Sequence, residues 1–347
     1  MKQTSDLRVE ELIPLIPPQE LGREIAITEE AAAFVSDSRQ QIVNIIQRQD
    51  KRLLVIVGPC SIHDEQMAND YASRLAKIMP ELSDRLYIIM RVYFEKPRTS
   101  VGWKGLISDP HMDGSTDMAT GLRTARRILL NIAQTGVPTA TEMLDPIIPQ
   151  YTADLISWGA IGARTTESQT HREMSSGLSM PIGYKNSTEG DVDAAINAIK
   201  AARECHTFLG INAEGHACIV KTRGNSDGHV ILRGGRQGAN FDPVTLQQVS
   251  AKLKAQGLID AVVVDCSHDN SGKIARNQEL VCQLVINERL HGYPQIVGVM
   301  LESNINEGKQ PISPDLSKLC YGVSVTDDCM GWEQTEKLLR WMHSQLG

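Results

Sequence analysis

The stretch AVVVDCSH, residues 261–268, decides the fold of this 347-residue chain, because an apolar run there ends in four chemically useful residues. The valines are followed by Asp265, Cys266, Ser267 and His268. Apolar runs of this length, without polar alternation, are typical of strands that are buried on both faces, as in a parallel sheet covered by helices. The stretch therefore predicts a buried parallel strand with reactive groups at its carboxyl end.

Seven other stretches repeat this pattern. Each is short, is rich in aliphatic residues, and finishes on a cysteine or a charged residue. In chain order they are LLVIVGPC (53–60), YIIMR (87–91), TATE (139–142), AIGAR (160–164), PIGYK (181–185), HVILR (229–233) and IVGVMLE (296–302). Their final residues are Cys60, Arg91, Glu142, Arg164, Lys185, Arg233 and Glu302.

Amphipathic segments lie between these strands. GLRTARRILLNIAQ (121–134) places its apolar residues on one helical face and is followed by Gly136, and VTLQQVSAKLKAQ (244–256) is followed by Gly257 in the same way. Eight strands that alternate with helices predict an α/β fold, a (β/α)8 TIM barrel, whose active site forms at the carboxyl ends of the strands. A doubly wound open sheet is the competing architecture, but it would leave some strand ends far from a common crevice.

Composition and charge restrict the class of protein. Hydrophobic residues make up 41% of the chain, which is enough for a sizeable core. No apolar run approaches the length of a membrane span, and the N-terminus lacks the apolar centre of a signal peptide, so we expect a cytoplasmic protein with no membrane partner. A net charge of −7 disfavours nucleic acid as a partner. Seven cysteines without a CxxC pair indicate a reducing compartment.

An N-terminal arm is expected before the barrel. Residues 1–45 include the Pro-rich stretch 13–20, which cannot be a continuous helix, and a helix over 36–49 that leads into the barrel and is capped by Ser36 or Asp37. We assign this arm to assembly and regulation and residues 46–347 to the catalytic barrel. Its apolar side chains need burial, for which we favour another subunit over the barrel base. They are Leu12, Ile13, Leu15 and Ile16.

A second addition is expected within the barrel, over about residues 207–225. Two strand-like runs flank the tetrapeptide NAEG there, which predicts an inserted β-hairpin. Because this segment follows a helix and precedes a strand, it should lie at the N-terminal face of the barrel, opposite the chemistry. Extra structure on that face favours a role in assembly or regulation.

Four residues predict a metal site. Cys60, His268 and Glu302 follow or end three strands, and Asp327 lies in the loop 324–332. A thiolate, an imidazole and two carboxylates suit a divalent first-row transition metal such as Mn, Fe, Co or Zn rather than Ca. Since the last and first strands are neighbours in a closed barrel, we expect these groups at one rim. The alternative is that each residue has only a structural role.

Cations also gather at the expected strand ends. Several positive side chains in one cavity are costly unless an anion compensates them, so the sequence predicts a strongly anionic ligand. Arginine forks match carboxylate and phosphate groups, and lysine supplies a point charge. The alternative is that these are ordinary surface cations. They are Arg91, Arg164, Lys185 and Arg233, with Lys96 and Arg98 in the loop 95–100.

Six blocks of sequence carry a resemblance to a known family. They resemble 3-deoxy-D-arabino-heptulosonate 7-phosphate (DAHP) synthase, in the metal-dependent type I form of enteric bacteria and fungi, and the similarity runs from about residue 6 to the C-terminus. One departure is KNSTEG (185–190), where Ser187 replaces a glycine of the family pattern and puts the loop conformation in question. The blocks are GPCSIH (58–63), RVYFEKPRT (91–99), GWKGLISDPHMDGS (102–115), SWGAIGARTTESQTHRE (157–173), ILRGG (231–235) and DCSHDNS (265–271).

The resemblance implies that phosphoenolpyruvate and erythrose 4-phosphate condense to DAHP and phosphate, the first step of the shikimate pathway. It implies a metal on Cys60, His268, Glu302 and Asp327 that polarises the aldehyde carbonyl. Glu142 would lie near the reacting end, and Lys96 and a water on the metal are the two candidates for proton transfer. Arg98 and Thr99 would hold the aldose phosphate. The residues implied for phosphoenolpyruvate are Arg91, Lys96, Arg164, Lys185 and Arg233.

The resemblance also implies regulation by an aromatic amino acid in a homo-dimer or tetramer, with the inhibitor bound between the arm of one subunit and the barrel base and hairpin of another. Members sensitive to phenylalanine carry serine at the position of Gly210, and glycine leaves room for a phenolic hydroxyl. Tyrosine is therefore the predicted inhibitor, with phenylalanine as the alternative. The residues that match the cavity are Asp6, Val9, Gln150, Met174, Leu178, Ser179, Phe208, Gly210 and Val220.

Three other functions are kept as alternatives. A class I aldolase would use Lys185 as a Schiff base. A related synthase would take a different sugar phosphate, such as arabinose 5-phosphate, and a non-catalytic amino-acid sensor would use the same barrel without turnover. A further hypothesis concerns Cys329, two residues after Asp327: without metal, Cys60 and Cys329 would oxidise to a disulfide.

Overall fold

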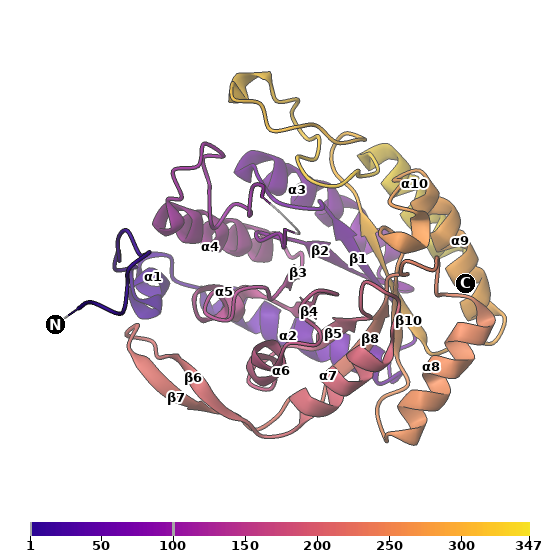
Figure 1. The fold of residues 1–347 in the computed structure, drawn as a ribbon. Helices are drawn as coiled ribbons and strands as arrows, with labels where there is room; N and C mark the ends of the chain where they lie inside the picture. Colours follow the sequence, from indigo (N-terminus) through magenta and orange to yellow (C-terminus); the bar gives the residue numbers. More distant parts are fainter. Residues whose placement is uncertain (1, 99–100) are drawn as a thin grey trace.

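A closed barrel of parallel strands forms the centre of the computed structural model, which describes residues 2–98 and 101–347 (Figure 1). The order around the barrel is β1-β10-β9-β8-β5-β4-β3-β2. Pairing of β1 with β10 closes the sheet, which confirms the predicted TIM barrel and excludes an open sheet. The strands are β1 (Leu53–Gly58), β2 (Leu86–Arg91), β3 (Thr139–Glu142), β4 (Trp158–Ile161), β5 (Ile182–Lys185), β8 (Gly228–Leu232), β9 (Val262–Asp265) and β10 (Ile296–Glu302).

Helices cover the outside of the barrel. No helix in the described ranges is both long and apolar enough to cross a lipid bilayer. Short 3₁₀ turns are η1 (Ala153–Leu155), η2 (Asp269–Ser271) and η3 (Leu316–Lys318). The helices are α1 (Pro18–Glu24), α2 (Glu29–Ile46), α3 (Glu65–Leu82), α4 (Met118–Gln134), α5 (Pro149–Thr152), α6 (Gln169–Ser175), α7 (Asp193–Arg203), α8 (Pro243–Ala255), α9 (Asn277–Leu290) and α10 (Trp332–Gln345).

Helix α4 illustrates how local sequence produces the outer layer. The Asp117 side chain accepts a hydrogen bond from the Thr120 N–H and caps the first turn. The apolar face predicted from the sequence is buried, and each fully buried leucine or isoleucine contributes roughly 1.5–3 kcal/mol. Gly136 follows with φ +77°, a conformation that glycine adopts without strain at a helix end.

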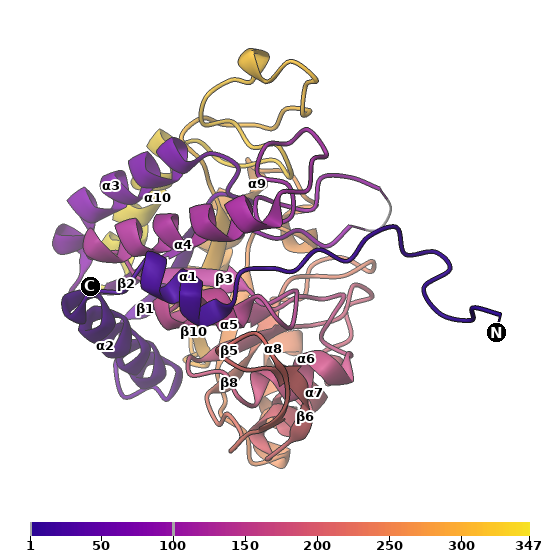
Figure 2. The same cartoon turned by 90° about the vertical axis from the view of Figure 1, so that its left-hand side faces the viewer.

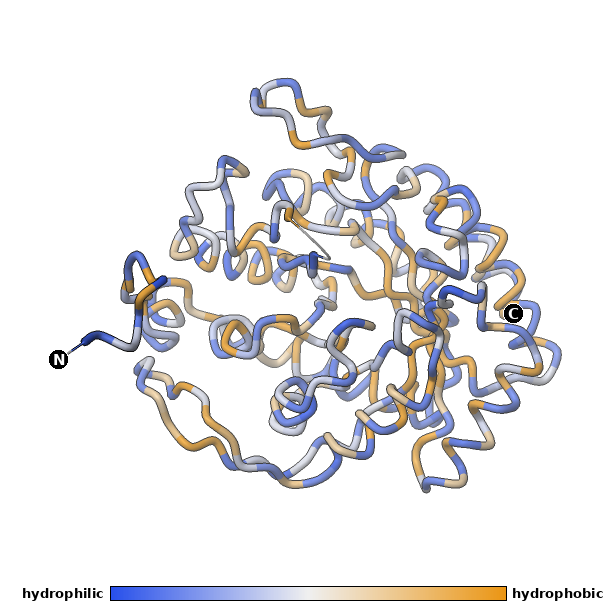
Figure 3. Tube along the Cα trace, in the orientation of Figure 1, coloured by the Kyte–Doolittle hydropathy of each residue, from blue (hydrophilic) through white to orange (hydrophobic). Residues whose placement is uncertain are grey.

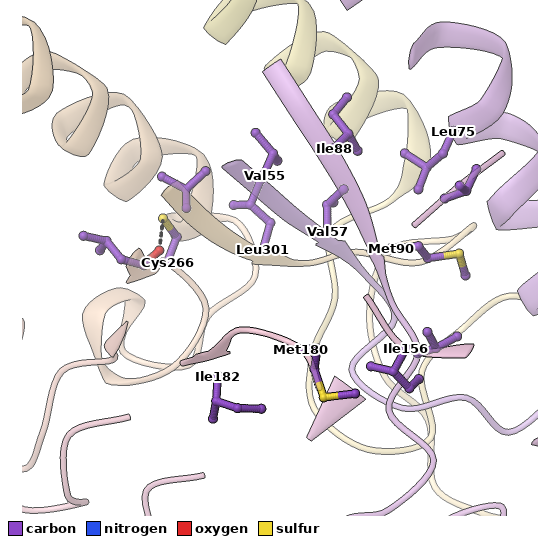
Figure 4. Packing of buried hydrophobic residues seen from close by; sticks show 14 of the residues in the cluster. Val55, Val57, Leu75, Ile88, Met90, Ile156, Met180, Ile182, Cys266 and Leu301 are labelled. Carbon is purple, nitrogen blue, oxygen red and sulfur yellow. Dashed lines mark hydrogen bonds between the residues drawn. The ribbon is translucent and has the colours of Figure 1, made fainter. Parts of the chain in front are cut away.

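The inside of the barrel is filled with side chains and closed at its base by α2. Ile42, Ile45 and Ile46 of α2 pack in one cluster with inward-facing strand residues, including the fully buried Trp158. A larger cluster lies between the strands and the surrounding helices, and Figure 4 shows part of it. The apolar stretches of the chain concentrate in the strands, while the helices alternate between apolar and polar residues (Figure 3).

The helix that leads into the barrel begins earlier than the sequence predicted. It is α2, Glu29–Ile46, rather than a helix over 36–49 with its cap at Ser36 or Asp37. The cap is Thr28, whose hydroxyl accepts a hydrogen bond from an N–H of the first turn. The early turns of α2 pack against α4. These tertiary contacts stabilise helical turns that precede the predicted capping residues.

The inserted hairpin consists of β6 (Thr207–Ile211) and β7 (Ala217–Lys221). At its base, the hydroxyls of Ser176 and Thr222 lie 2.7 Å apart, which ties the hairpin to the loop before β5. That loop lies at the N-terminal ends of the strands, as predicted for the insertion. At its tip, the Gln19 N–H in α1 donates to a hairpin carbonyl at 2.8 Å (Figure 1), and residues before α1 extend away from the barrel (Figure 2).

His229 provides a pH test of the barrel interior. It is fully buried beside Trp158, whose Nε1–H donates to His229 Nε2 at 3.2 Å. Burial lowers the pKa of His229 from 6.5 to about 4, so the folded chain excludes a proton that the unfolded chain binds. The free energy of unfolding should therefore fall as the pH drops from 6.5 to about 4, by roughly 3 kcal/mol.

The variant His229→Gln should lose this part of the pH dependence, because glutamine does not titrate and its side-chain oxygen is able to accept the same hydrogen bond. Urea unfolding at about pH 7.5 and about pH 4.5 measures the effect. The wild type should lose more stability between these pH values than the variant. Equal losses in the two proteins would contradict the assignment.

Candidate active site

Closure of the barrel brings Cys60 beside Glu302. Strands β1 and β10 pair with Gly58 opposite Glu302, and Cys60 follows two residues later. The Cys60 sulfur and one oxygen each of Glu302 and Asp327 all lie within 4.8 Å of one another. The Cys60 Sγ is 3.7 Å from Asp327 Oδ2. The structure thus gathers three of the four predicted metal ligands at one point of the barrel mouth.

His268, the fourth predicted ligand, lies outside that group of three. Its Nδ1 is 2.8 Å from Asp265 Oδ2 and 3.1 Å from the Ser267 hydroxyl. Burial opposes ionisation of Asp327, but the charges of Lys96 and His268 lower the pKa of its carboxyl, so His268 acts on the group from nearby. A carboxylate that orients a histidine through one ring nitrogen, and leaves the other for an ion, is common around protein metal sites.

The donor set fits a transition metal better than a hard cation. A thiolate is a soft ligand, whereas Ca²⁺ and Mg²⁺ take oxygen ligands. Burial, followed by the charge of Glu302, raises the pKa of the Cys60 thiol to about 11, so the thiol is protonated in the absence of an ion. Cys329 is also fully buried, and burial and the neighbouring Cys60 raise the pKa of its thiol.

Arg91 and Lys96 lie against the same aromatic ring. Arg91, fully buried at the end of β2, donates through Nη2 to Glu302 Oε1 at 2.9 Å. Its guanidinium carbon is 3.9 Å from the centre of the Tyr93 ring, and the Lys96 ammonium is 5.4 Å from it. Burial would lower the pKa of Lys96, but the nearby Cys60 and Glu302 raise it, which keeps Lys96 cationic.

Two further cations at the mouth already have carboxylate partners. Lys185 Nζ is 2.8 Å from Asp265 Oδ2, and Arg233 Nη1 is 2.5 Å from Asp269 Oδ2. These carboxylate partners were not predicted from the sequence. The cations therefore need less compensating negative charge from a ligand than the sequence suggested. Burial acts against ionisation of Asp265, but His268 and Lys185 hold the pKa of its carboxyl well below the usual value.

Three of the remaining predicted residues lie at or after strand ends. Glu142 ends β3, and its carboxylate packs so closely on Gly162 that a Cβ there would lie 2.1 Å from Oε1. Arg164 is exposed after β4. Arg98 is exposed too, and its Nε donates to the Trp103 carbonyl at 2.7 Å. Thr99 lies outside the described residues.

Ser187 does not disturb the loop after Lys185. Its N–H donates to the Asp191 carbonyl at 3.0 Å, and its hydroxyl accepts a hydrogen bond from the Asp191 N–H at 3.1 Å. The backbone of Ser187 is not in the left-handed region, so the position does not require the glycine of the family pattern.

The residues predicted to bind a regulator fall in three parts of the chain: the arm, the α5–α6 region and the hairpin. In the hairpin, Phe208 is paired with Val220 on the face opposite the exposed Leu209. A Cβ at Gly210 would lie 2.8 Å from Val220 Cγ2, so a larger residue would have to displace Val220. The set comprises Asp6 and Val9 in the arm, Gln150, Met174, Leu178 and Ser179 in and after α5 and α6, and Phe208, Gly210 and Val220 in the hairpin.

Sequence reasoning gave no role to two residues of the site. Asp265 was recognised only as the end of a valine run, although a carboxylate at a buried strand end demands a cationic partner. Tyr93 lies two residues after Arg91 in an extended segment. Residues at this spacing point to the same side, and this spacing was the sequence signal that could have placed Tyr93 beside Arg91.

Comparisons with known proteins show which family the chain matches. Residues 24–340 match the DAHP synthetase I family. The chain is 52% identical over 332 residues to the Tyr-sensitive phospho-2-dehydro-3-deoxyheptonate aldolase of Escherichia coli (strain K12), which covers 96% of this chain and 93% of the relative. It is 51% identical over 338 residues to the Phe-sensitive protein of the same strain, covering 97% and 96%.

A solved structure is similar over nearly the whole chain. It is that of phospho-2-dehydro-3-deoxyheptonate aldolase from Francisella tularensis SCHU S4, with a TM-score of 0.95 and 45% identity. The similarity covers 97% of this chain and 98% of that one.

Asp265→Asn should destabilise the chain by roughly 3–5 kcal/mol, because it leaves the buried Lys185 without its ionic partner and His268 without its orienting carboxylate. Asp193→Asn is the matched control, since Asp193 pairs with Lys252 at 2.7 Å on an exposed surface and should change stability by less than about 1 kcal/mol. Urea unfolding of both variants measures the difference. Similar small effects would show that the buried pairs do not support the fold.

Proposed function

The chain belongs to the DAHP synthetase I family, and from this premise we propose that it condenses phosphoenolpyruvate with erythrose 4-phosphate to give DAHP and phosphate. The observation that carries the proposal is the joint placement of the Cys60, Glu302 and Asp327 group with Arg91 and Lys96 at one barrel mouth. Ligand-type side chains and phosphate-binding cations in one place suit a reaction between two phosphorylated substrates.

Phosphoenolpyruvate would be held by cations at or after the ends of four strands, β2, β4, β5 and β8. Lys185 and Arg233 are fixed by Asp265 and Asp269, so their remaining donors are positioned before a substrate arrives. Arg91 is held by Glu302. Such preorganisation lowers the entropic cost of holding two substrates in a reactive orientation. The full set would be Arg91, Lys96, Arg164, Lys185 and Arg233.

The aldose phosphate would bind further out, at the exposed Arg98 with Thr99. Glu142, at the end of β3, would lie near the reacting end of phosphoenolpyruvate. Lys96 is the residue of this set that would move a proton, since it is cationic and lies beside Cys60 and Glu302.

A divalent transition metal would be held by Cys60, His268, Glu302 and Asp327, and when bound it would supply Lewis acidity to the aldehyde carbonyl. His268 would offer the ring nitrogen that Asp265 does not occupy. Mn, Fe, Co and Zn all suit this mixed set of sulfur, nitrogen and oxygen donors.

A class I aldolase that forms a Schiff base is a less well supported function for the same residues. It would require Lys185 to react as a neutral amine, but the Lys185 ammonium is buried against the Asp265 carboxylate at 2.8 Å. The amine would have to break this buried contact before it could attack a carbonyl group.

Cys60→Ala should lower metal-dependent phosphate release by about a hundredfold or more, since even residues that only orient metal ligands cost 10–100-fold when replaced. The assay mixes both substrates with protein that has been chelated and then supplied with metal, and metal content is measured in parallel. Cys205→Ala is the matched control, because Cys205 is exposed and remote from the barrel mouth. Full activity of Cys60→Ala without metal would refute the assignment.

We further propose that residues 1–45 and the hairpin serve assembly into a dimer or tetramer and feedback inhibition. Leu12 and Ile13 of the arm are 81% and 77% exposed in the single chain, and Leu209 and Ile219 of the hairpin are 85% and 68% exposed. Apolar side chains that face solvent in two neighbouring segments favour contact with another subunit.

Tyrosine is the inhibitor that Gly210 favours. The two Escherichia coli relatives are nearly equal in identity, so their names alone do not choose between tyrosine and phenylalanine. Gly210 lies opposite Cys218 in the hairpin and beside Val220, where a side chain would take the space of a phenolic hydroxyl.

Gly210→Ser should weaken inhibition by tyrosine by about tenfold and leave uninhibited turnover largely unchanged, because a Cβ at this position displaces Val220 and narrows the cavity. Phosphate release is measured with tyrosine, phenylalanine and tryptophan in turn. An unchanged response to tyrosine would place the inhibitor elsewhere.

A further inference from the structure

Tyr93 is an aromatic residue whose ring contacts two cations of the site, Arg91 and Lys96. It follows β2, is only 1% exposed, and comes from the same segment as Arg91 and Lys96. The Arg91 guanidinium and the Lys96 ammonium both lie within cation–π distance of its ring. The ring therefore contacts two groups that we assign to substrate binding.

The hydroxyl of Tyr93 has no hydrogen-bond partner among the described residues, although it is buried. Buried tyrosine hydroxyls nearly always find a partner, because an unsatisfied polar group in a protein interior is costly. No neighbouring group among the described residues satisfies the Tyr93 hydroxyl. A partner that arrives with the substrate would explain it.

Charged groups from several strand ends lie around Tyr93. Burial raises the pKa of the phenol, and Arg91, Glu142, Asp265 and Glu302 all act on it electrostatically. These four residues stand at the ends of two pairs of neighbouring strands, β2 with β3 and β9 with β10, which flank β1. The phenol keeps its proton and is a donor.

We propose that Tyr93 contacts the substrate: its hydroxyl donates a hydrogen bond to an anionic oxygen of the phosphoenolpyruvate that Arg91 and Lys96 attract. The inference rests on the proposed function and adds one contact to it. The ring contacts the two cations, and in this proposal the anion that they bind offers the Tyr93 hydroxyl an acceptor.

Tyr71 offers a matched control. It is also fully buried, but its hydroxyl donates to the Ser303 hydroxyl at 2.9 Å, and its ring packs edge-on against Trp332 at 5.3 Å. Removing the Tyr71 hydroxyl breaks an existing hydrogen bond, whereas removing the Tyr93 hydroxyl breaks none within the protein. Tyr71→Phe should therefore lower the stability of the protein, whereas Tyr93→Phe should leave it unchanged or raise it.

The test compares Tyr93→Phe and Tyr71→Phe in the full, metal-restored protein. Without substrate, Tyr93→Phe should melt at or above the wild-type temperature, and Tyr71→Phe should melt below it. Calorimetric titration with phosphoenolpyruvate alone should show about tenfold weaker binding for Tyr93→Phe and wild-type binding for Tyr71→Phe. The KM for phosphoenolpyruvate should rise in Tyr93→Phe by a similar factor.

Wild-type affinity in Tyr93→Phe would overturn the inference, and so would a clear loss of stability in that variant, since either result gives the hydroxyl a purely structural role. Wild-type protein that neither binds phosphoenolpyruvate nor releases phosphate would instead refute the proposed function. The two failures are therefore distinguishable from the wild-type titration.

Discussion

The parallel pairing of β1 with β10 is the contact on which the rest of the molecule depends. It closes the sheet, and its register sets Gly58 against Glu302, so the first and last strands of the barrel deliver Cys60 and Glu302 to one place. A sheet left open between these strands would keep the same local elements but separate the two groups by its full width. Closure of the barrel therefore also assembles the site. At the opposite end of the barrel, three isoleucines of α2 pack against the inward-facing strand residues.

The second constraint is the neutralisation of buried charge. The mouth contains cations that water hardly reaches, and each of Arg91, Lys185 and Arg233 has a carboxylate from another part of the barrel. Buried pairs of this kind add little to stability compared with apolar packing, because desolvation offsets most of their attraction. Their value here lies in orientation: Asp265 alone fixes an ammonium from β5 and an imidazole from the loop after β9.

The two ends of the barrel have different physical characters. The carboxyl ends of the strands gather charged groups, whereas the arm and hairpin expose apolar side chains and meet each other at the hairpin tip. The assembly and regulation that we propose for the arm and the hairpin would leave the charged mouth free for small anionic molecules. The short helix α6 lies between them: it begins after the loop that contains Arg164, and residues predicted for the regulator lie at its end.

The fold could be predicted from local patterns, because strand periodicity and the residue that ends each strand are local properties. The eight barrel strands and the closure of the barrel were predicted, and so was the meeting of Cys60, Glu302 and Asp327. Only the tertiary structure decided which charges pair, since Lys185 and Asp265 are 80 residues apart and meet across the barrel. It also decided where α2 begins and that Asp265 holds the His268 ring. Those outcomes follow from packing between distant segments, which no local pattern records.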